Sequence, residues 1–83
     1  MGKTTAGKDE QKRFFKDTFR LNLKRIRLEK GLSQNDVAKK LDYPVSTYAN
    51  WEQGRTEPGV SDIAKLLSVL HTEANELFAT DRQ

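Results

Sequence analysis

The segment SQNDVAKKLDYPVSTYANWEQG, residues 33–54, begins with a strong signal for the start of a helix. Ser33 is a preferred N-cap residue, and Asp36 stands three residues later, as in a capping box. Apolar residues at helical spacing follow at once. This pattern predicts a short helix over residues 34–41.

A break of three residues separates this helix from a second one. Pro44 pushes the residue before it out of the helical region, so the two helices cannot be continuous. The second helix is expected over residues 45–53 and ends at Gly54, a residue type that favours helix C-termini. Two short helices joined so closely cross at a steep angle, and this is the geometry of a helix-turn-helix.

The second helix of this pair has two unlike faces. Tyr48 and Trp51 are three residues apart and share the face that would pack inward. The other face carries small or uncharged polar side chains, which suit the major groove, because asparagine can pair with adenine and methyl groups can contact thymine. The residues expected at base edges are Val45, Ser46, Ala49 and Asn50. The alternative is an ordinary surface helix with two core aromatic residues.

Apolar stripes predict three further helices. The stripes consist of Phe15, Phe19, Leu23 and Ile26; of Val60, Ile63, Leu67 and Leu70; and of Ala74, Leu77 and Phe78. The first of these helices is expected to begin near Lys12 and to stop at Gly31. Since no segment alternates with a period of two over five residues, no strand is expected. The predicted fold class is all-α, with five helices in a repressor-like helix-turn-helix domain.

Charge is unevenly distributed along the 83 residues, whose formal net charge is +3. Residues 1–30 hold ten Lys/Arg against four acidic residues, whereas residues 31–83 hold five against eight. Residues 1–11 contain few apolar residues and are expected to form a flexible basic tail, followed by one domain over 12–79 and a C-terminal tail over 80–83. A basic first third favours an anionic partner such as nucleic acid, although a solvated helix with a cationic tail explains the charge equally well.

Several functional classes find no support in the composition. The chain has no cysteine, which excludes disulfides and thiolate chemistry and fits the reducing cytoplasm. No apolar run approaches the ~20 residues of a membrane span. His71 is the only histidine, and no nucleophile, phosphate-binding loop or metal-ligand spacing accompanies it. We therefore expect no enzyme, no cofactor and no bound metal.

An ordered set of motifs connects the chain with a known family. The matching pieces are LKRIR (23–27), KGLSQNDVA (30–38), NWEQG (50–54) and EP (57–58), followed by a leucine-rich helix. From Phe19 to Phe78 the chain resembles the phage repressor and Cro type of helix-turn-helix domain, the Xre-like family. The resemblance implies a sequence-specific transcriptional regulator that binds double-stranded DNA, as a homodimer on a two-fold-related site.

The resemblance also implies roles for individual residues. Gln34 stands where the family bonds a DNA phosphate, at a helix N-terminus that favours anions. Ala38 stands where a small residue lets two helices approach closely. Arg27 and Glu52 match a partly buried ion pair between the first and third helices. The residues expected against phosphates are Ser33, Gln34, Thr47, Gln53 and Arg55.

The chain departs from the family pattern at several positions. Asp42 occupies a turn position that is usually glycine, and aspartate tolerates the left-handed conformation better than most residues. Pro44 replaces the usual side-chain N-cap of the recognition helix, which leaves its start at Val45 or one residue later. Tyr48 and Trp51 are larger than the usual aliphatic residues.

The first predicted helix extends beyond the family's first helix and carries two adjacent rings. Phe14 and Phe15 are expected to enlarge the core, with a partner site as the less favoured alternative. The alternative for the whole chain is a protein-binding module, such as an antitoxin or co-activator, that shares the fold but uses its main surface for a protein.

Overall fold

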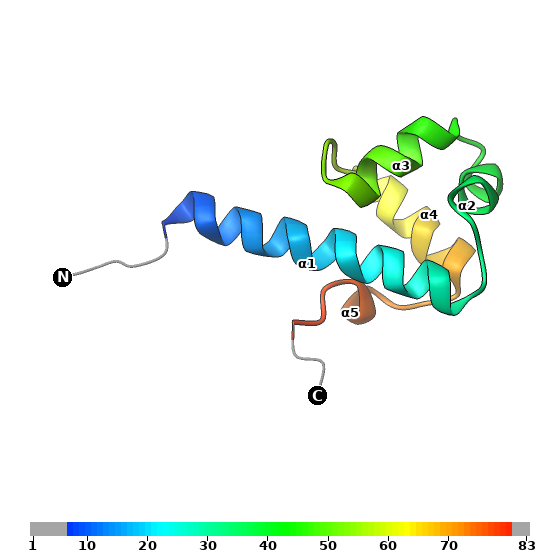
Figure 1. Ribbon diagram of the computed structural model, residues 1–83. Helices are drawn as coiled ribbons and strands as arrows, with labels where there is room; N and C mark the ends of the chain where they lie inside the picture. The colour runs from blue at the N-terminus through cyan, green and yellow to red at the C-terminus, as the bar shows by residue number, and fades with distance from the viewer. Residues whose placement is uncertain (1–6, 81–83) are drawn as a thin grey trace.

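The computed structural model describes residues 7–80, and the regular secondary structure of this part of the chain is entirely helical (Figure 1). The helices are α1 (Lys8–Glu29), α2 (Gln34–Leu41), α3 (Val45–Gln53), α4 (Val60–Leu70) and α5 (Ala74–Leu77). The predicted all-α fold with five helices is therefore confirmed. No helix within residues 7–80 has both the length and the hydropathy to cross a membrane.

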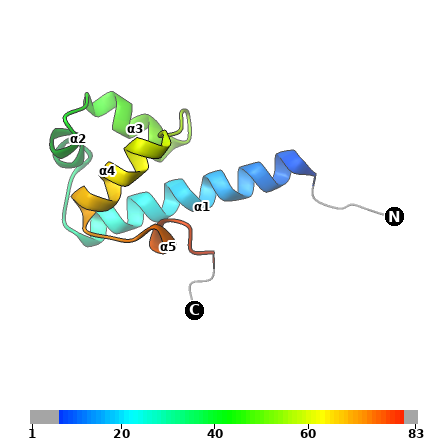
Figure 2. The same cartoon turned by 180° about the vertical axis from the view of Figure 1, so that it is seen from behind.

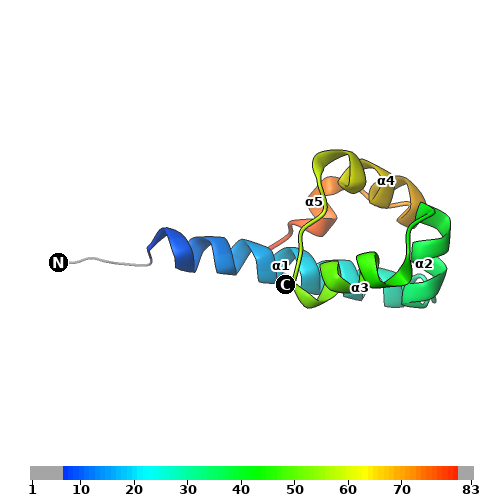
Figure 3. The same cartoon turned by 90° about the horizontal axis from the view of Figure 1, so that it is seen from above.

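Helix α1 is much longer than the others and organises the fold. Its C-terminal half packs against the other helices, whereas its N-terminal half projects beyond them (Figures 1 and 2). Helix α3 lies on one side of α1 and α5 on the other, while α2 lies near the C-terminal end of α1 (Figures 1 and 3). The first half of α1 is thus an arm with few neighbours.

The arm begins four residues earlier than the sequence analysis predicted. Helix α1 starts at Lys8 instead of Lys12, so residues 8–11 are helical and do not belong to a flexible tail. The carboxylate of Glu10 accepts a hydrogen bond from the Gly7 N–H at 3.3 Å, which satisfies one free donor at the helix start. Asp9 adds a second negative charge to the first turn, where the helix dipole favours it. The remaining tail residues, 1–6 and 81–83, lie outside the described part.

The core is built from the inward faces of all five helices. Its buried members are Phe19, Leu23, Ile26, Val37, Ala38, Leu41, Tyr48, Trp51, Leu66, Leu70 and Leu77. Helix α5 is tied to this core by Asn22, whose buried amide donates to the carbonyls of Leu77 at 2.9 Å and Ala79 at 3.0 Å. A helix of only four residues is not stable by itself, so α5 depends on these contacts with α1.

Several residues expected in the core are exposed, among them Ala74 and Phe78 of the last predicted stripe. Phe14 and Phe15 were expected to extend the core, but they lie on the projecting arm with 52% and 55% of their surface exposed. Val60 is 87% exposed because it is the first residue of α4, beyond the reach of α1. Helix α4 instead buries Leu66 and Leu70, so its inward face is rotated relative to the stripe that the sequence indicated.

Candidate nucleic-acid interface

Helices α2 and α3 are joined by a tight turn, as the segment 33–54 predicted. Asp42 adopts the left-handed conformation with φ 65° and ψ 41°, and the next N–H, that of Tyr43, donates to the Ala38 carbonyl at 3.0 Å. Ala38 is buried, and its small side chain allows the two helices to approach. Helix α3 begins at Val45 without a side-chain cap, which resolves the question that Pro44 raised.

The left-handed turn residue gives a testable prediction. Asp42→Gly should stabilise the domain by about 0.5–1 kcal/mol, because glycine adopts this conformation without a Cβ penalty. Asp42→Ala keeps the Cβ atom and should be less stable than the wild type. Urea unfolding of the three proteins measures the order. A glycine variant no more stable than the wild type would show that Asp42 causes no strain in the turn.

The face of α3 that points away from the core carries the predicted base-edge residues. Val45 and Ser46 are exposed, and Ala49 and Asn50 are partly exposed. Within residues 7–80, no group bonds to the side-chain amide of Asn50 or to the hydroxyl of Ser46. These groups are therefore free to bond to a ligand, and they lie one turn apart on one short, rigid helix.

The opposite face of α3 is fixed in the core. Tyr48 and Trp51 are 0% and 4% exposed, and their rings meet edge to face with centroids 6.0 Å apart. Trp51 also contacts the Tyr43 ring, at 5.8 Å between centroids. Tyr48 precedes Asn50 and Trp51 follows it, and both rings are held in the core. The outward side chains of α3 therefore have a defined direction.

A buried polar network joins α3 to α1. The guanidinium of Arg27 donates from Nε to Glu52 Oε2 at 2.6 Å and from Nη2 to Oε1 at 3.1 Å, which makes a two-pronged ion pair. The Tyr48 hydroxyl donates to Glu52 Oε2, and the amide of Gln34 donates to Oε1 at 3.0 Å. Glu52 thus receives four hydrogen bonds, and the buried charge pair predicted for Arg27 and Glu52 is satisfied on every side.

The network shifts the pKa of its members. Burial by itself would raise the pKa of Glu52, but the hydrogen bonds from Arg27, Tyr48 and Gln34 outweigh it, and the pKa is lowered. The hydrogen bond to Glu52 raises the pKa of Arg27 against the effect of its own burial. Burial and the bond to Glu52 raise the pKa of Tyr48 above its usual range. All three groups therefore keep one protonation state at neutral pH.

Two members of this network were not predicted from the sequence. Tyr48 was expected in the core for its ring only, and Gln34 was expected to contact a phosphate. Tyr48 precedes Glu52 by four residues, the spacing at which helical side chains meet, and this signal was present in the sequence.

The candidate phosphate residues lie at or near the ends of α2 and α3. Ser33 caps α2, accepting from the Asp36 N–H at 2.9 Å, while its own N–H donates to the Asp36 carboxylate at 2.8 Å. This bond lowers the pKa of Asp36. Thr47 is partly buried, in the first turn of α3, and Gln53 and Arg55 are exposed at its end.

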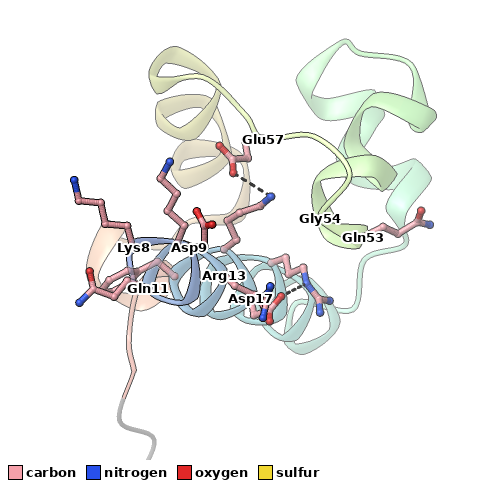
Figure 4. A pocket seen from close by; sticks show the side chains of 12 residues that line it. Lys8, Asp9, Gln11, Arg13, Asp17, Gln53, Gly54 and Glu57 are labelled. Atoms are coloured by element: carbon pink, nitrogen blue, oxygen red, sulfur yellow. Dashed lines mark hydrogen bonds and ion pairs between the residues drawn. The ribbon is translucent and has the colours of Figure 1, made fainter. Parts of the chain in front are cut away.

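The end of α3 also faces the arm of α1 across an open groove (Figure 4). Gly54 has φ 78°, a conformation that favours glycine, and a Cβ atom there would lie 3.0 Å from Arg20 Cδ, so the Arg20 side chain would have to shift slightly. In Figure 4, Gln53 points away from the groove. Lys16 reaches across it to Glu57 at 3.6 Å.

The chain was compared with models of known protein families. The helix-turn-helix family model matches residues 23–77, which are more than half of the chain. The chain belongs to this family. The match agrees with the resemblance to the Xre/Cro type and covers the turn between α2 and α3, the buried ion pair and every core residue except Phe19, but not α1 before residue 23. The family is one of DNA-binding regulators. Comparisons with curated proteins and with solved structures found no match.

Proposed function

We propose that the protein is a sequence-specific regulator of transcription that inserts α3 into the major groove of double-stranded DNA. The observation that supports it most directly is the contrast between the two faces of α3. One face is locked by Tyr48, Trp51 and Glu52, while the other presents Asn50 and Ser46 without partners in the described chain. A rigid helix with free hydrogen-bonding groups is what direct readout of base edges needs.

In this proposal each residue on the outward face of α3 makes a different kind of contact with the bases. The residues that contact base edges are Val45, Ser46, Ala49 and Asn50. Asn50 is the main one, because its amide can donate and accept at the same time to adenine. Val45 and Ala49 supply methyl groups that can contact thymine, and Ser46 can bond to several bases.

The phosphate contacts proposed for Ser33, Gln34, Thr47, Gln53 and Arg55 surround this face. The first residues of α2 have no intrahelical partner for their N–H groups, and their positive dipole end favours an anion. The Gln34 amide has two N–H donors, of which one reaches Glu52. The second remains for a phosphate, so Gln34 would link the DNA backbone to the buried network.

The double role of Gln34 gives a prediction. Gln34→Ala should weaken binding to specific and to non-specific duplexes by similar factors, because a phosphate contact carries no sequence information. It should also cost about 1 kcal/mol of stability, since Glu52 loses one of its four hydrogen bonds. Fluorescence anisotropy at fixed salt measures the first effect and urea unfolding the second. Loss of binding at the specific site alone would mean that Gln34 contacts a base.

The protein is proposed to act as a homodimer on a two-fold-related site in the cytoplasm, without a cofactor. One α3 contacts only a few base pairs, and small domains of this type gain affinity and specificity by pairing.

Selection of genomic fragments followed by footprinting tests the proposed function, since it returns the site, its symmetry and the half-site spacing together. Affinity for the selected site should fall steeply as salt increases, because several phosphates are contacted and counterions are released. A protein-binding module would select no fragment above background, and its interface would respond weakly to salt. That result would contradict the proposal and favour the antitoxin or co-activator alternative.

A further inference from the structure

Helix α1 has a second apolar stripe, on the face opposite to the core. Phe14, Leu21 and Leu28 are 52%, 53% and 57% exposed and follow one another at intervals of seven residues. Seven residues are two helical turns with a drift of only about 20°, so the three side chains lie along one line. We call this line the α1 seam. A shallow depression lined by Leu21, Lys24, Arg25, Leu28 and Glu29 lies on it.

The seam has no function in the fold, because the core of the monomer uses the other face of α1. Phe19, Leu23 and Ile26 are buried there, about half a helical turn away from the seam. Heptad spacing of apolar residues is the pattern with which one helix packs along another. The family model begins at residue 23, so Phe14 and Leu21 lie outside the matched segment.

We propose that a second copy of this chain packs on the α1 seam, with the two α1 helices antiparallel and the two-fold axis passing at Leu21. In this register Leu21 faces Leu21 of the second copy, and Phe14 faces Leu28 of the second copy, since both lie seven residues from the centre. The seam is therefore complementary to itself, as a two-fold interface must be.

The charges beside the seam agree with this register. Asp17 and Lys24 lie on the same flank of the seam, and in an antiparallel pair each comes opposite the other residue of the second copy. Lys24 has no ion-pair partner in residues 7–80, and Asp17 is paired with Arg20 of its own chain at 2.9 Å but keeps its side chain 45% exposed. On the other flank Arg25 is paired with Glu29 at 2.9 Å and comes opposite the uncharged Thr18 of the second copy. Two attractive pairs form across the axis, and the Arg20 of each copy, which lies near the axis on the same flank, is neutralised by Asp17 of its own chain.

The position of α3 relative to the seam agrees as well. Helix α3 contacts α1 through Arg27 and next to Arg20, about a quarter turn from the seam, whereas α5 contacts α1 through Asn22 on the opposite flank. Figure 1 shows α3 and α5 on opposite sides of α1. The two-fold axis is perpendicular to both α1 helices and to the line that joins them. It therefore keeps both copies of α3 on one side of the dimer. A palindromic DNA site requires this arrangement.

Dimerisation through the seam does not depend on the proposed function; only its consequence for DNA does. Sedimentation analysis without DNA should show a dimer of the wild-type chain at micromolar concentration. Leu21→Glu should raise the dissociation constant on the order of a hundredfold or more, because two carboxylates would face each other at the axis. Val60→Glu, at an exposed apolar residue off the seam, is the matched control and should leave the dimer intact. Circular dichroism and melting should confirm that both variants fold, since both positions are exposed.

Cross-linking tests the register. Because the chain has no native cysteine, only the introduced cysteines can react. Leu21→Cys should form a covalent dimer with a short bis-maleimide. Phe14→Cys and Leu28→Cys should not cross-link alone but should form a heterodimer when they are mixed. Cross-linking of all three variants by themselves would show a parallel pair and overturn the proposed register.

Other outcomes overturn the dimer surface itself. A wild-type chain that stays monomeric at 100-fold higher concentration than the DNA assay uses would do so. A dimer that Leu21→Glu leaves unchanged would do so as well, because another surface would hold it. If the seam dimer forms but selects no DNA fragment, the proposed function fails and the dimer surface stands.

Discussion

Replacing Glu52 with alanine is expected to destabilise the domain by about 3–5 kcal/mol. Arg27 is only 6% exposed, and without Glu52 its charge stays buried with the Leu32 carbonyl as its remaining partner, at 2.7 Å. The Tyr48 hydroxyl and the Gln34 amide lose their acceptor at the same time. Urea unfolding at neutral pH measures the loss.

A double-mutant cycle separates the pair from its surroundings. Arg27→Met, Glu52→Gln and the combined variant should show a coupling, with the double variant losing less stability than the two single losses added together. The double variant leaves no uncompensated charge behind, which is the physical reason for the difference. If the single effects simply add, the two side chains do not interact in solution.

Glu52 should also make the stability of the domain depend on pH in the acid range. The pKa of Glu52 is lower in the folded chain than its ordinary value, so its contribution to stability is complete above the unfolded pKa and is lost as the pH falls through the folded pKa. The carboxylates of Asp36 and of Asp62 in α4 also have lowered pKa values, because they accept hydrogen bonds from Ser33 and from the Tyr43 hydroxyl, and they act in the same direction. Comparison of the wild type with Glu52→Gln isolates the Glu52 part, and the variant should lose less stability on acidification.

Trp51→Ala is the second large expected effect, at about 3–5 kcal/mol. Trp51 is 4% exposed, and its ring packs edge to face with the rings of Tyr48 and Tyr43. Its loss would leave a cavity between α3, the turn after α2 and the loop that leads to α4. Melting followed by circular dichroism should show a variant that is unfolded or nearly so at physiological temperature.

The neighbouring residue supplies the control for this experiment. Asn50→Ala should change stability by no more than about 0.5 kcal/mol, because an outward polar side chain contributes little to packing. If Trp51→Ala melted close to the wild type, the inward face of α3 would be wrongly assigned, and with it the outward face.

The parts of the fold that were predictable have strong local signals. The cap at Ser33, the break at Pro44 and the stop at Gly54 are conformational preferences of single residues, and the bounds of α2 and α3 followed from them. The start of α1 was missed because its first turn contains no apolar residue to continue the stripe. The bond from the Gly7 N–H to Glu10, which holds this turn, is a signal of polar residues that hydrophobic periodicity does not detect.

Burial was harder to predict than secondary structure. Phe14 and Phe15 continue the pattern of a core helix, yet whether they are buried depends on where the other helices end, and this is a property of the tertiary structure. In the candidate interface, the pairing of Arg27 with Glu52 followed from the family resemblance. The hydrogen bonds of Tyr48 and Gln34 to Glu52 were not predicted. Hydrophobic periodicity counts tyrosine only as an apolar ring, and the family resemblance assigned Gln34 only to a phosphate.

The central claim is that α3 reads base edges through its outward face, and Asn50 tests it most directly. The measurement is the affinity of the wild type and of Asn50→Ala for the selected site and for its single-base variants, by fluorescence anisotropy at fixed salt. The proposal predicts a loss of ~1–3 kcal/mol at the selected site and relaxed discrimination at one position in each half-site. If Asn50→Ala binds the selected site undiminished and discriminates at every position as the wild type does, Asn50 reads no base and the claim is contradicted.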